Sequence, residues 1–232
     1  MNSTAQRTAL VTGAGRGLGL ALARALLSGG WHVVVDARRA DLLSSALPGA
    51  VVLSGDVTDP VHRDALVSDV HRLDLLVNNA SDLGPSPLPR LADVPMQAAR
   101  RVYETNVLAP LALTQRFLPL LRASRGTVVN ISSDAAVEAY PGWGAYGSSK
   151  AALDQLTAIL AAEEPELAVY SVDPGDMRTD MHQAAFPGED ISDRPAPETV
   201  VPALLRLIAT RPPGTRHRAA DLTDASVPEV SS

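Results

Sequence analysis

Short apolar runs alternate with longer amphipathic stretches along most of the chain. The apolar runs are rich in β-branched residues and lack polar alternation, which is typical of strands buried on both faces of a parallel sheet. They predict strands at 8–12, 31–36, 50–53, 73–77, 127–131 and 167–172, and a short last strand at 218–222. The amphipathic stretches predict helices at 18–27, 61–71, 96–122, 145–162 and 197–210. This alternation indicates an α/β fold, a single-domain, Rossmann-type, doubly wound parallel β-sheet flanked by helices on both faces.

We expect one domain over residues 1–232, because no repeat or linker interrupts this alternation. Two proline-rich loops, at about 81–95 and 176–197, follow strands at the end of the sheet where such folds bind ligands. These loops are therefore expected to contact a substrate. The polar residues 223–232 are expected to form a flexible tail.

Composition narrows the possible chemistry. The 232 residues are 46% apolar and 20% charged, carry a net charge of −6 and include no cysteine. The absence of cysteine excludes disulfides, zinc–thiolate sites and thiol nucleophiles, and we expect no metal site. The acidic balance argues against a nucleic-acid or anionic-membrane partner. The polar N-terminus and the short apolar runs predict a cytoplasmic protein with no signal peptide and no membrane contact.

A glycine-rich turn follows the first predicted strand, in the order Thr12-Gly13-Ala14-Gly15-Arg16-Gly17-Leu18-Gly19. A turn of this kind between a strand and a helix directs backbone N–H groups and a helix N-terminus at one point, which favours a bound pyrophosphate. The spacing is not G-x-G-x-x-G, since Leu18 stands where the third glycine would fall. A flexible turn is the alternative for an isolated glycine cluster, and the flanking strand and helix favour the nucleotide site.

The end of the second predicted strand, Val35-Asp36-Ala37-Arg38-Arg39, offers both signs of charge. A carboxylate there accepts a hydrogen bond from the 2′-hydroxyl of NAD, whereas arginine suits the 2′-phosphate of NADP. Arg16 in the glycine turn adds a second positive group. Two arginines against Asp36 favour NADP(H) over NAD(H), and a solvated arginine pair is the alternative.

Tyr146 and Lys150 stand four residues apart, on one face of a predicted helix. A nearby cation lowers the pKa of a phenol from about 10, so this tyrosine is expected to act as an acid and base near neutral pH. Lys150 is the only lysine in a chain that has four tyrosines, which makes an accidental exposed pair a poor alternative. Ser133 ends the fifth predicted strand and is placed to bind a substrate carbonyl, although a serine there is more often a turn or cap residue.

Asn106 lies inside the long predicted helix, and Pro110 follows it by four residues. Because Pro110 has no N–H to donate, the helix is expected to kink and leave the Asn106 carbonyl free to hold a water molecule. A kinked surface helix without function is the alternative.

Together these residues resemble the single-domain, NADP-preferring branch of the short-chain dehydrogenase/reductase family, over about residues 8–179. The glycine turn matches the family's T-G-x-x-x-G-x-G, and Asn78-Asn79-Ala80 matches its N-N-A-G, with Ser81 in place of the glycine. The resemblance implies that Asn106, Ser133, Tyr146 and Lys150 are the catalytic residues. It implies cofactor contacts from Gly13, Arg16, Gly17, Leu18, Gly19, Arg38, Asp56, Val57, Asn79, Ala80, Tyr146, Lys150, Pro174, Gly175, Met177 and Thr179.

The implied activity is NADP(H)-dependent, reversible hydride transfer between the nicotinamide and a ketone, an aldehyde or a secondary alcohol. Tyr146 would protonate the alkoxide, Lys150 would hold the ribose, Ser133 would orient the carbonyl and Asn106 would anchor a water. Alternatives are a catalytically silent NADP-binding regulator and a non-redox epimerase or dehydratase.

The substrate is expected to be a small carbonyl or alcohol compound in a partly apolar pocket. Its contacts are expected from Asp134, Tyr140, Trp143 and Met181, with Leu83, Met177, His182 and Phe186 as further candidates. The resemblance also implies a homodimer or homotetramer, packed through the helices that carry Asn106 and Tyr146. The chain lacks the glycine-rich C-terminal strand that is common in the family.

Overall fold

The computed structural model describes residues 6–38 and 41–223. One parallel sheet of seven strands, in the order β3-β2-β1-β4-β5-β6-β7, forms its centre. The strands are β1 (Thr8–Val11), β2 (His32–Ala37), β3 (Val51–Ser54), β4 (Leu75–Asn78), β5 (Thr127–Ile131), β6 (Ala168–Asp173) and β7 (Arg216–Arg218). The predicted doubly wound parallel sheet in a single domain is confirmed.

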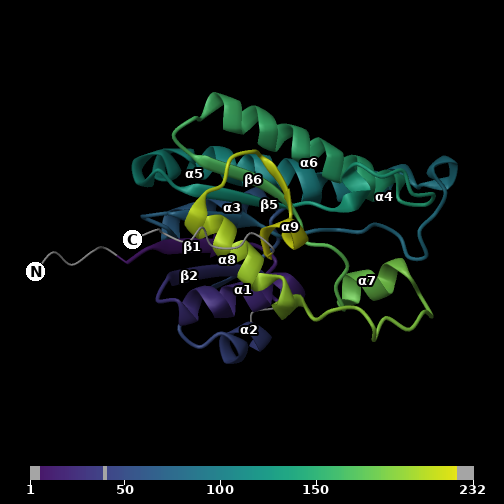
Figure 1. Ribbon diagram of the computed structural model, residues 1–232, viewed down its shortest axis with the longest axis horizontal. Coiled ribbons are helices and arrows are strands. Elements are labelled where there is room, and N and C mark those ends of the chain that lie inside the picture. Colours follow the sequence, from purple (N-terminus) through teal and green to yellow (C-terminus); the bar gives the residue numbers. More distant parts are fainter. Residues whose placement is uncertain (1–5, 39–40, 224–232) are drawn as a thin grey trace, which may run out of the picture.

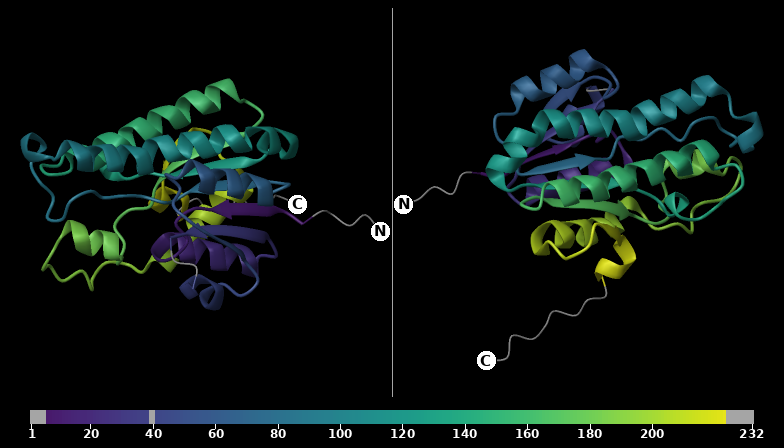
Figure 2. Two further views of the ribbon diagram at one scale, coloured as in Figure 1. Left: turned by 180° about the vertical axis from the view of Figure 1, so that it is seen from behind. Right: turned by 90° about the horizontal axis from the view of Figure 1, so that it is seen from above.

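Helices cover both faces of the sheet (Figure 1). The α-helices are α1 (Gly17–Ser28), α2 (Asp41–Ala46), α3 (Pro60–Asp69), α4 (Met96–Tyr103), α5 (Ala109–Ser124), α6 (Gly144–Glu163), α7 (Asp180–Ala185), α8 (Val201–Thr210) and α9 (Ala219–Thr223). Short 3-10 turns are η1 (Leu91–Asp93), η3 (Asp134–Ala136) and η4 (Pro197–Thr199), and η2 (Glu104–Leu108) is a π-helical turn. Helix α4, the turn η2 and helix α5 follow one another without a break and form one rod, which lies beside α6 in both views of Figure 2.

The alternation of side chains along the strands creates two apolar cores, because successive side chains point to opposite faces of a sheet. On β1, Ala9 and Val11 pack in a core with α1 and α8. Leu10, between them, packs in the second core with α3 and α5, where Phe117 is fully buried. Since both faces of the strands are buried, the strands carry the continuous apolar runs seen in the sequence.

The strand order changes direction between β1 and β4, and this point determines where a ligand can enter the molecule. The connection after β1 leads to α1 on one face, whereas β4 is followed by the chain that leads to α4 and α5 on the other face. A crevice between diverging loops at the carboxyl ends of the strands is the usual ligand site in such folds. The short helix α7, from the predicted substrate loop 176–197, stands beside this end of the sheet (Figure 1).

The structure corrects three local predictions. The last strand is Arg216–Arg218, and the predicted strand at 218–222 is wrong because Ala219 begins α9; alanine favours helix over strand. The single helix predicted at 96–122 is α4 and α5 joined by the π-helical turn η2, instead of a kinked α-helix. The short α2 was not predicted. Within the described ranges, none of the helices is long and apolar enough to cross a membrane, and the expected cytoplasmic location stays a prediction.

Candidate active site

Hydrogen bonds with the residues that follow β4 hold the glycine turn in place. Thr12 Oγ1 accepts hydrogen bonds from the backbone N–H groups of Asn79 and Ala80, each at 3.0 Å. The Asn79 amide donates to the carbonyl oxygens of Thr12 at 2.9 Å and Gly13 at 3.2 Å. Gly13 has φ +64°, and a Cβ there would lie 2.7 Å from the Cα of Ala80. Only glycine therefore allows the turn to sit this close to β4.

Asp36 supports the same turn from the side of β2. It is 1% exposed, its Oδ1 accepts the Gly13 N–H at 2.8 Å, and its Oδ2 lies 3.2 Å from Nε2 of the buried His62. Both carboxylate oxygens are thus engaged inside the protein. The Asp36 side chain therefore holds the glycine turn in place, and its effect on the choice between NADP and NAD stays a prediction.

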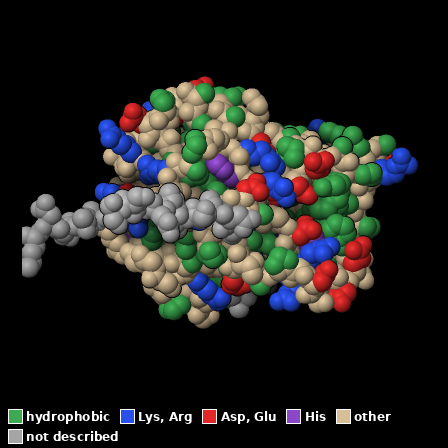
Figure 3. All heavy atoms as spheres, in the orientation of Figure 1, with side chains coloured by type: hydrophobic (Ala, Val, Ile, Leu, Met, Phe, Trp, Pro, Cys, Tyr) green, Lys and Arg blue, Asp and Glu red, His purple; other side chains and the backbone are tan. Residues whose placement is uncertain are grey.

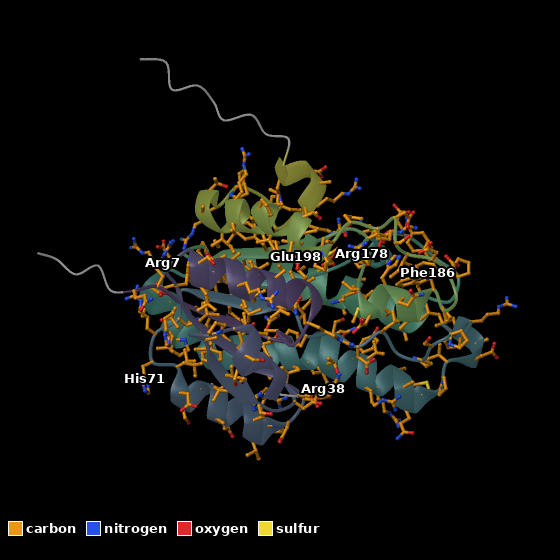
Figure 4. The ribbon with its side chains drawn as sticks, turned by 90° about the horizontal axis from the view of Figure 1, so that it is seen from below. Arg7, Arg38, His71, Arg178, Phe186 and Glu198 are labelled. Carbon is orange, nitrogen blue, oxygen red and sulfur yellow. The ribbon has the colours of Figure 1, made fainter. Side chains whose placement is uncertain are left out.

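Arg38 extends from the loop after β2 and is exposed (Figure 4). It lies near Asp56, the residue expected to contact adenine. Although partial burial opposes it, hydrogen bonds from the Thr58 N–H and hydroxyl, together with the charges of Arg38 and His62, hold the pKa of Asp56 below its usual value. Val57 beside it is buried. Arg38 and Asp56 thus form an open, charged rim at the end of β2 and β3, and Arg39 lies outside the described residues.

Tyr146 and Lys150 lie one turn apart on α6, as predicted, and are 8% and 2% exposed. The Lys150 ammonium donates to the Ile131 carbonyl at the end of β5, at 2.7 Å, and lies 5.5 Å from the centre of the Tyr146 ring. Burial lowers the pKa of Lys150 to about 8, and the nearby Asp154 carboxylate opposes that shift. Lys150 is therefore a buried cation anchored to the sheet beside the phenol.

The expected low pKa of the phenol is not found in the protein alone. Burial raises the pKa of Tyr146 to about 12, and the nearby hydroxyls of Ser133 and Ser81 only partly offset it. The carboxylates of Asp134 and Asp173 raise the pKa further. The sequence argument counted the cation at Lys150 but not the burial of the ring or these two carboxylates, so the predicted lowering is wrong for the protein alone. At neutral pH the phenol keeps its proton.

Ser133 ends β5 and caps the short turn η3. Its hydroxyl donates to Asp134 Oδ1 at 3.0 Å and accepts the Ala135 N–H at 3.2 Å. The second Asp134 oxygen accepts the Tyr140 hydroxyl at 3.0 Å. Ser133 is thus a cap residue whose hydroxyl also lies near the Tyr146 phenol, and its contact with a substrate carbonyl stays a prediction.

Asn106 lies in the middle of the π-helical turn and is 1% exposed. Its amide donates to the Asp82 carbonyl and to Ser149 Oγ, both at 2.9 Å. Its oxygen accepts the Asp82 N–H at 2.8 Å and the Ser81 hydroxyl at 3.1 Å. The side chain therefore ties the loop after β4 to α6. The predicted water on its carbonyl stays a prediction.

The segment after β6 closes the other side of the expected cofactor site. Following Pro174, the Gly175 N–H donates to Asp173 Oδ1 at 2.9 Å, and Met177 packs against the core that contains α1. Thr179 caps α7 by accepting the His182 N–H at 3.2 Å. Next to it, Asp180 pairs with Arg16 of the glycine turn at 2.6 Å, both side chains being exposed. The glycine turn and the substrate loop are thus directly connected.

Four residues expected to contact the substrate lie on one side of the Tyr146 phenol. The Trp143 ring packs edge-on to Tyr146 with centroids 5.7 Å apart, and Phe186 lies 6.0 Å beyond it at the end of α7 (Figure 4). Tyr140 packs on Trp143 at 6.4 Å, and Met181 joins the same small apolar cluster. On the face shown in Figure 3, apolar side chains gather on the right, where α7 lies, among acidic and basic ones.

Sequence reasoning missed three polar groups of this region. His62 reaches Asp36 only because of a packing contact between α3 and the loop after β3. Ser81 was noted as a departure from the family motif, yet it donates to Asn106 and lies near Tyr146. Arg216 comes from β7, distant in sequence, and donates to the Ser133 carbonyl at 3.1 Å. No local motif marks His62 or Arg216, whereas Ser81 stands inside a motif of the family.

The fold and these residues define a dinucleotide-binding α/β protein, with a glycine turn at the start of α1 and a buried tyrosine–lysine pair beside the carboxyl ends of β5 and β6. A family model described as short chain dehydrogenase matches residues 7–190. The chain belongs to this short-chain dehydrogenase family of oxidoreductases.

Relatives and solved structures agree with this membership. L-fucose dehydrogenase of Oryctolagus cuniculus is 36% identical over 188 residues, which cover 77% of this chain and 66% of that protein. Sepiapterin reductase of Mus musculus is 36% identical over 199 residues, which cover 76% of each chain. A short chain dehydrogenase of Shigella flexneri, solved in complex with NADP, superposes with a TM-score of 0.85 at 30% identity, covering 92% of this chain and 97% of that one.

The residues present fit the nicotinamide dinucleotide that the family uses. The glycine turn leads directly into α1, which begins at Gly17, so backbone N–H groups and a helix N-terminus are available to a pyrophosphate. Arg38 supplies an exposed cation, and Asp56 keeps its charge, at the edge where the adenosine end would lie. The buried ammonium of Lys150 has one N–H engaged by Ile131, which leaves further donors for a ribose.

Proposed function

We propose that this chain is an NADP(H)-dependent reductase of ketones or aldehydes, with secondary alcohols as the reverse substrates. The observation that carries the proposal is the buried phenol of Tyr146, which keeps its proton at neutral pH, next to the cation of Lys150 and the hydroxyl of Ser133. A protonated phenol is a proton donor, and carbonyl reduction is the direction that needs one.

The preference for NADP(H) is supported by the charges at the end of β2. Arg38 is exposed there, whereas Asp36 is turned inward to Gly13 and His62. An exposed guanidinium suits a 2′-phosphate better than a 2′-hydroxyl. Arg16 is the second cation of this proposal, and it would have to leave Asp180 to reach the phosphate.

When bound, the nicotinamide would supply the hydride, and the protein's own groups would move the proton and fix the substrate. Tyr146 would donate its phenolic proton to the oxygen of the carbonyl as negative charge develops there. Ser133 would exchange its hydrogen bond to Asp134 for one to the same oxygen. Two donors converging on one oxygen stabilise the developing alkoxide.

Lys150 and Asn106 would maintain this arrangement. The Lys150 ammonium, held by the Ile131 carbonyl, would bind the ribose hydroxyls and stabilise negative charge on the phenol. The Asn106 side chain keeps the loop after β4 against α6, so Ser81 stays near the phenol. A water on the Asn106 carbonyl would return a proton to Tyr146 after each turnover.

The substrate class proposed here is an apolar or aromatic carbonyl compound. Trp143 and Phe186 form an aromatic wall beside Tyr146, with Met181 as an adaptable neighbour. Asp134 and Asp173 place negative charge near the reacting phenol. A carboxylate on the substrate would be repelled there, so neutral carbonyl compounds are favoured over keto acids.

A homodimer or homotetramer is part of the proposal. Tyr103 at the end of α4, Leu108 at the start of α5 and Ile159 on α6 are 37%, 48% and 43% exposed. Large apolar side chains exposed on the adjacent rod and helix α6 are suited to bury one another in a contact between copies. Light scattering at micromolar concentration measures the oligomeric state of the native chain and of Leu108→Glu. A dimeric or tetrameric native chain and a monomeric variant would support this part of the proposal, whereas a monomeric native chain would contradict it.

The central experiment combines cofactor titration with a carbonyl panel. Calorimetric titration with NADPH and NADH measures the preference, and NADPH absorbance follows turnover of aromatic ketones and aldehydes. We expect tighter binding of NADPH and turnover that is lost in Tyr146→Phe. Tight binding with no turnover on any compound would instead indicate a silent regulator. Product formation without net NADPH consumption would indicate an epimerase or dehydratase.

A further inference from the structure

The last strand of the sheet reaches the catalytic residues through one side chain. Arg216 on β7 donates through Nη2 to the carbonyl of Ser133 at 3.1 Å and through Nε to Asp154 Oδ2 at 2.9 Å. Both side chains are largely withdrawn from solvent, at 28% exposure for Arg216 and 14% for Asp154. The Arg216–Asp154 ion pair is therefore partly buried next to Ser133 and is not a solvated surface contact.

Asp154 continues the face of α6 that carries the catalytic pair. Tyr146, Lys150 and Asp154 follow one another at intervals of four residues, so they form one row along the helix. Asp154 is the carboxylate that opposes the loss of charge on the buried Lys150. One of its oxygens is bound by Arg216, and the other is buried with no hydrogen-bond partner among the described residues.

We propose that Arg216 and Asp154 are positioning residues of the catalytic site: Arg216 fixes the main chain of Ser133, and the pair sets the charge felt by Lys150. Arg216 does this by joining β7, the end of β5 and α6 through a single guanidinium. Its two donors lie in one plane, so they fix direction as well as distance.

The charged groups around the row determine the expected signs. Asp154 on α6 stabilises the Lys150 ammonium, and Arg216 on β7 partly neutralises Asp154. Asp134 after β5 and Asp173 at the end of β6 act on the Tyr146 phenol one turn earlier. Removing the carboxylate should therefore favour neutral Lys150, whereas removing the guanidinium should favour the charged form.

The lone lysine makes this measurable without turnover. In protein labelled with [ε-13C]lysine, Lys150 gives the only side-chain lysine signal, and its titration reports the pKa directly. We expect Asp154→Asn to shift the titration to lower pH, and Arg216→Gln to shift it to higher pH, each by about half a unit or more. Arg122→Gln, which removes an exposed partner of Glu164 at the far end of α6, is the matched control and should shift nothing.

The second measurement, of kcat and KM, rests on the proposed function and is interpreted separately from the titration. It uses NADPH and a ketone that the native enzyme reduces. We expect Arg216→Gln to lower kcat about tenfold with the KM for NADPH within about twofold, because Ser133 moves while the cofactor turn does not. Arg216→Lys should recover part of kcat. It adds a second lysine signal, so the signal of Lys150 is identified by comparison with the native protein, and it should keep its native titration.

Shifts of the same sign in Asp154→Asn and Arg216→Gln, or no shift in either, would overturn the charge coupling. An unchanged kcat in a folded Arg216→Gln enzyme would overturn the positioning of Ser133. If Arg216→Gln fails to fold, Asp154→Asn and Arg216→Lys still decide, because the first must lower the pKa of Lys150 and the second must not. Absence of turnover in the native enzyme would contradict the proposed function and leave the titration result intact.

Discussion

Replacing Asp36 tests whether its carboxylate contacts the cofactor ribose or holds the glycine turn that would bind the cofactor. In the structure its carboxylate accepts the Gly13 N–H at 2.8 Å and lies 3.2 Å from His62 Nε2, at 1% exposure. Asp36→Asn keeps an oxygen for Gly13 but loses the negative charge. Asp36→Leu removes both acceptors and leaves the partly buried Gly13 N–H and the buried His62 imidazole without this partner.

The magnitude follows from these two contacts. A buried donor left unpaired costs about 1–3 kcal/mol, so Asp36→Leu should lower the free energy of unfolding by about 2–5 kcal/mol. Asp36→Asn should cost about 1–2 kcal/mol, because one neutral hydrogen bond replaces a charge-assisted one. Since the turn would hold any dinucleotide pyrophosphate, affinity for NADPH and for NADH should fall by the same factor.

Urea unfolding and calorimetric titration with both cofactors measure these effects. Asp74→Asn is the matched control, because Asp74 accepts the Thr8 N–H at 2.8 Å at the opposite end of β1. It should lose a comparable free energy of unfolding and keep both affinities. Arg38→Ser should weaken NADPH about tenfold or more and leave NADH unchanged. A large gain in NADPH over NADH selectivity in Asp36→Asn would refute our reasoning, because it would place the carboxylate at the ribose.

Three further predictions concern the site. Gly13→Ala should abolish measurable NADPH binding and cost about 1–3 kcal/mol, because alanine is strained at φ +64° and its Cβ would meet Ala80; normal binding by calorimetry would contradict this. The pKa of Lys150 in the folded state, about 8, lies below its unfolded value, so the unfolded chain binds more protons between pH 8 and 10. The free energy of unfolding of the native protein should therefore rise by roughly 2–3 kcal/mol over this range relative to Lys150→Met, measured by urea unfolding. Parallel pH curves for the two proteins would exclude the low pKa. An amine-directed reagent should label Lys150 slowly, because this side chain is 2% exposed, and NADPH should slow that labelling further; equal labelling rates of Lys150 with and without NADPH would argue against a ribose contact.

The elements of the sheet were predictable because their signal is local. Runs such as Thr8–Val11 and Thr127–Ile131 are buried at every position and mostly apolar, so the pattern alone identifies them. The end of the chain was not, because β7 is a three-residue strand of sequence Arg-His-Arg. It pairs with β6 through backbone hydrogen bonds, and nothing in its side chains has the periodicity of a strand.

The proximity of Tyr146 and Lys150 was predictable for a similar reason, since a spacing of four residues places two side chains together in any α-helix. The properties of those groups were not predictable, because they depend on surroundings brought by other elements. The phenol pKa follows from the burial of the ring and from two carboxylates on different elements, Asp134 in η3 and Asp173 at the end of β6. A sequence motif fixes which groups meet but not the polarity of the space where they meet.

The environment of Asp36 shows how far such long-range fits extend. In the sequence, Asp36 was a charge at a strand end, and its use depended on which way the side chain turned. The direction is decided by His62, whose ring occupies the space where a side chain on Gly55 would lie. Any larger residue at position 55 would displace the imidazole and free Asp36 from it. Gly55→Ala should therefore weaken both cofactors as Asp36→Asn does, although residue 55 contacts neither the glycine turn nor Asp36 through a side chain. Calorimetric titration of Gly55→Ala is compared with that of Gly49→Ala, a control glycine with open space around it. Weaker binding in Gly55→Ala alone would indicate displacement of His62 and not a general loss of stability. Equal affinities for NADPH in Gly55→Ala and the native protein would show that the Asp36–His62 contact does not support the turn.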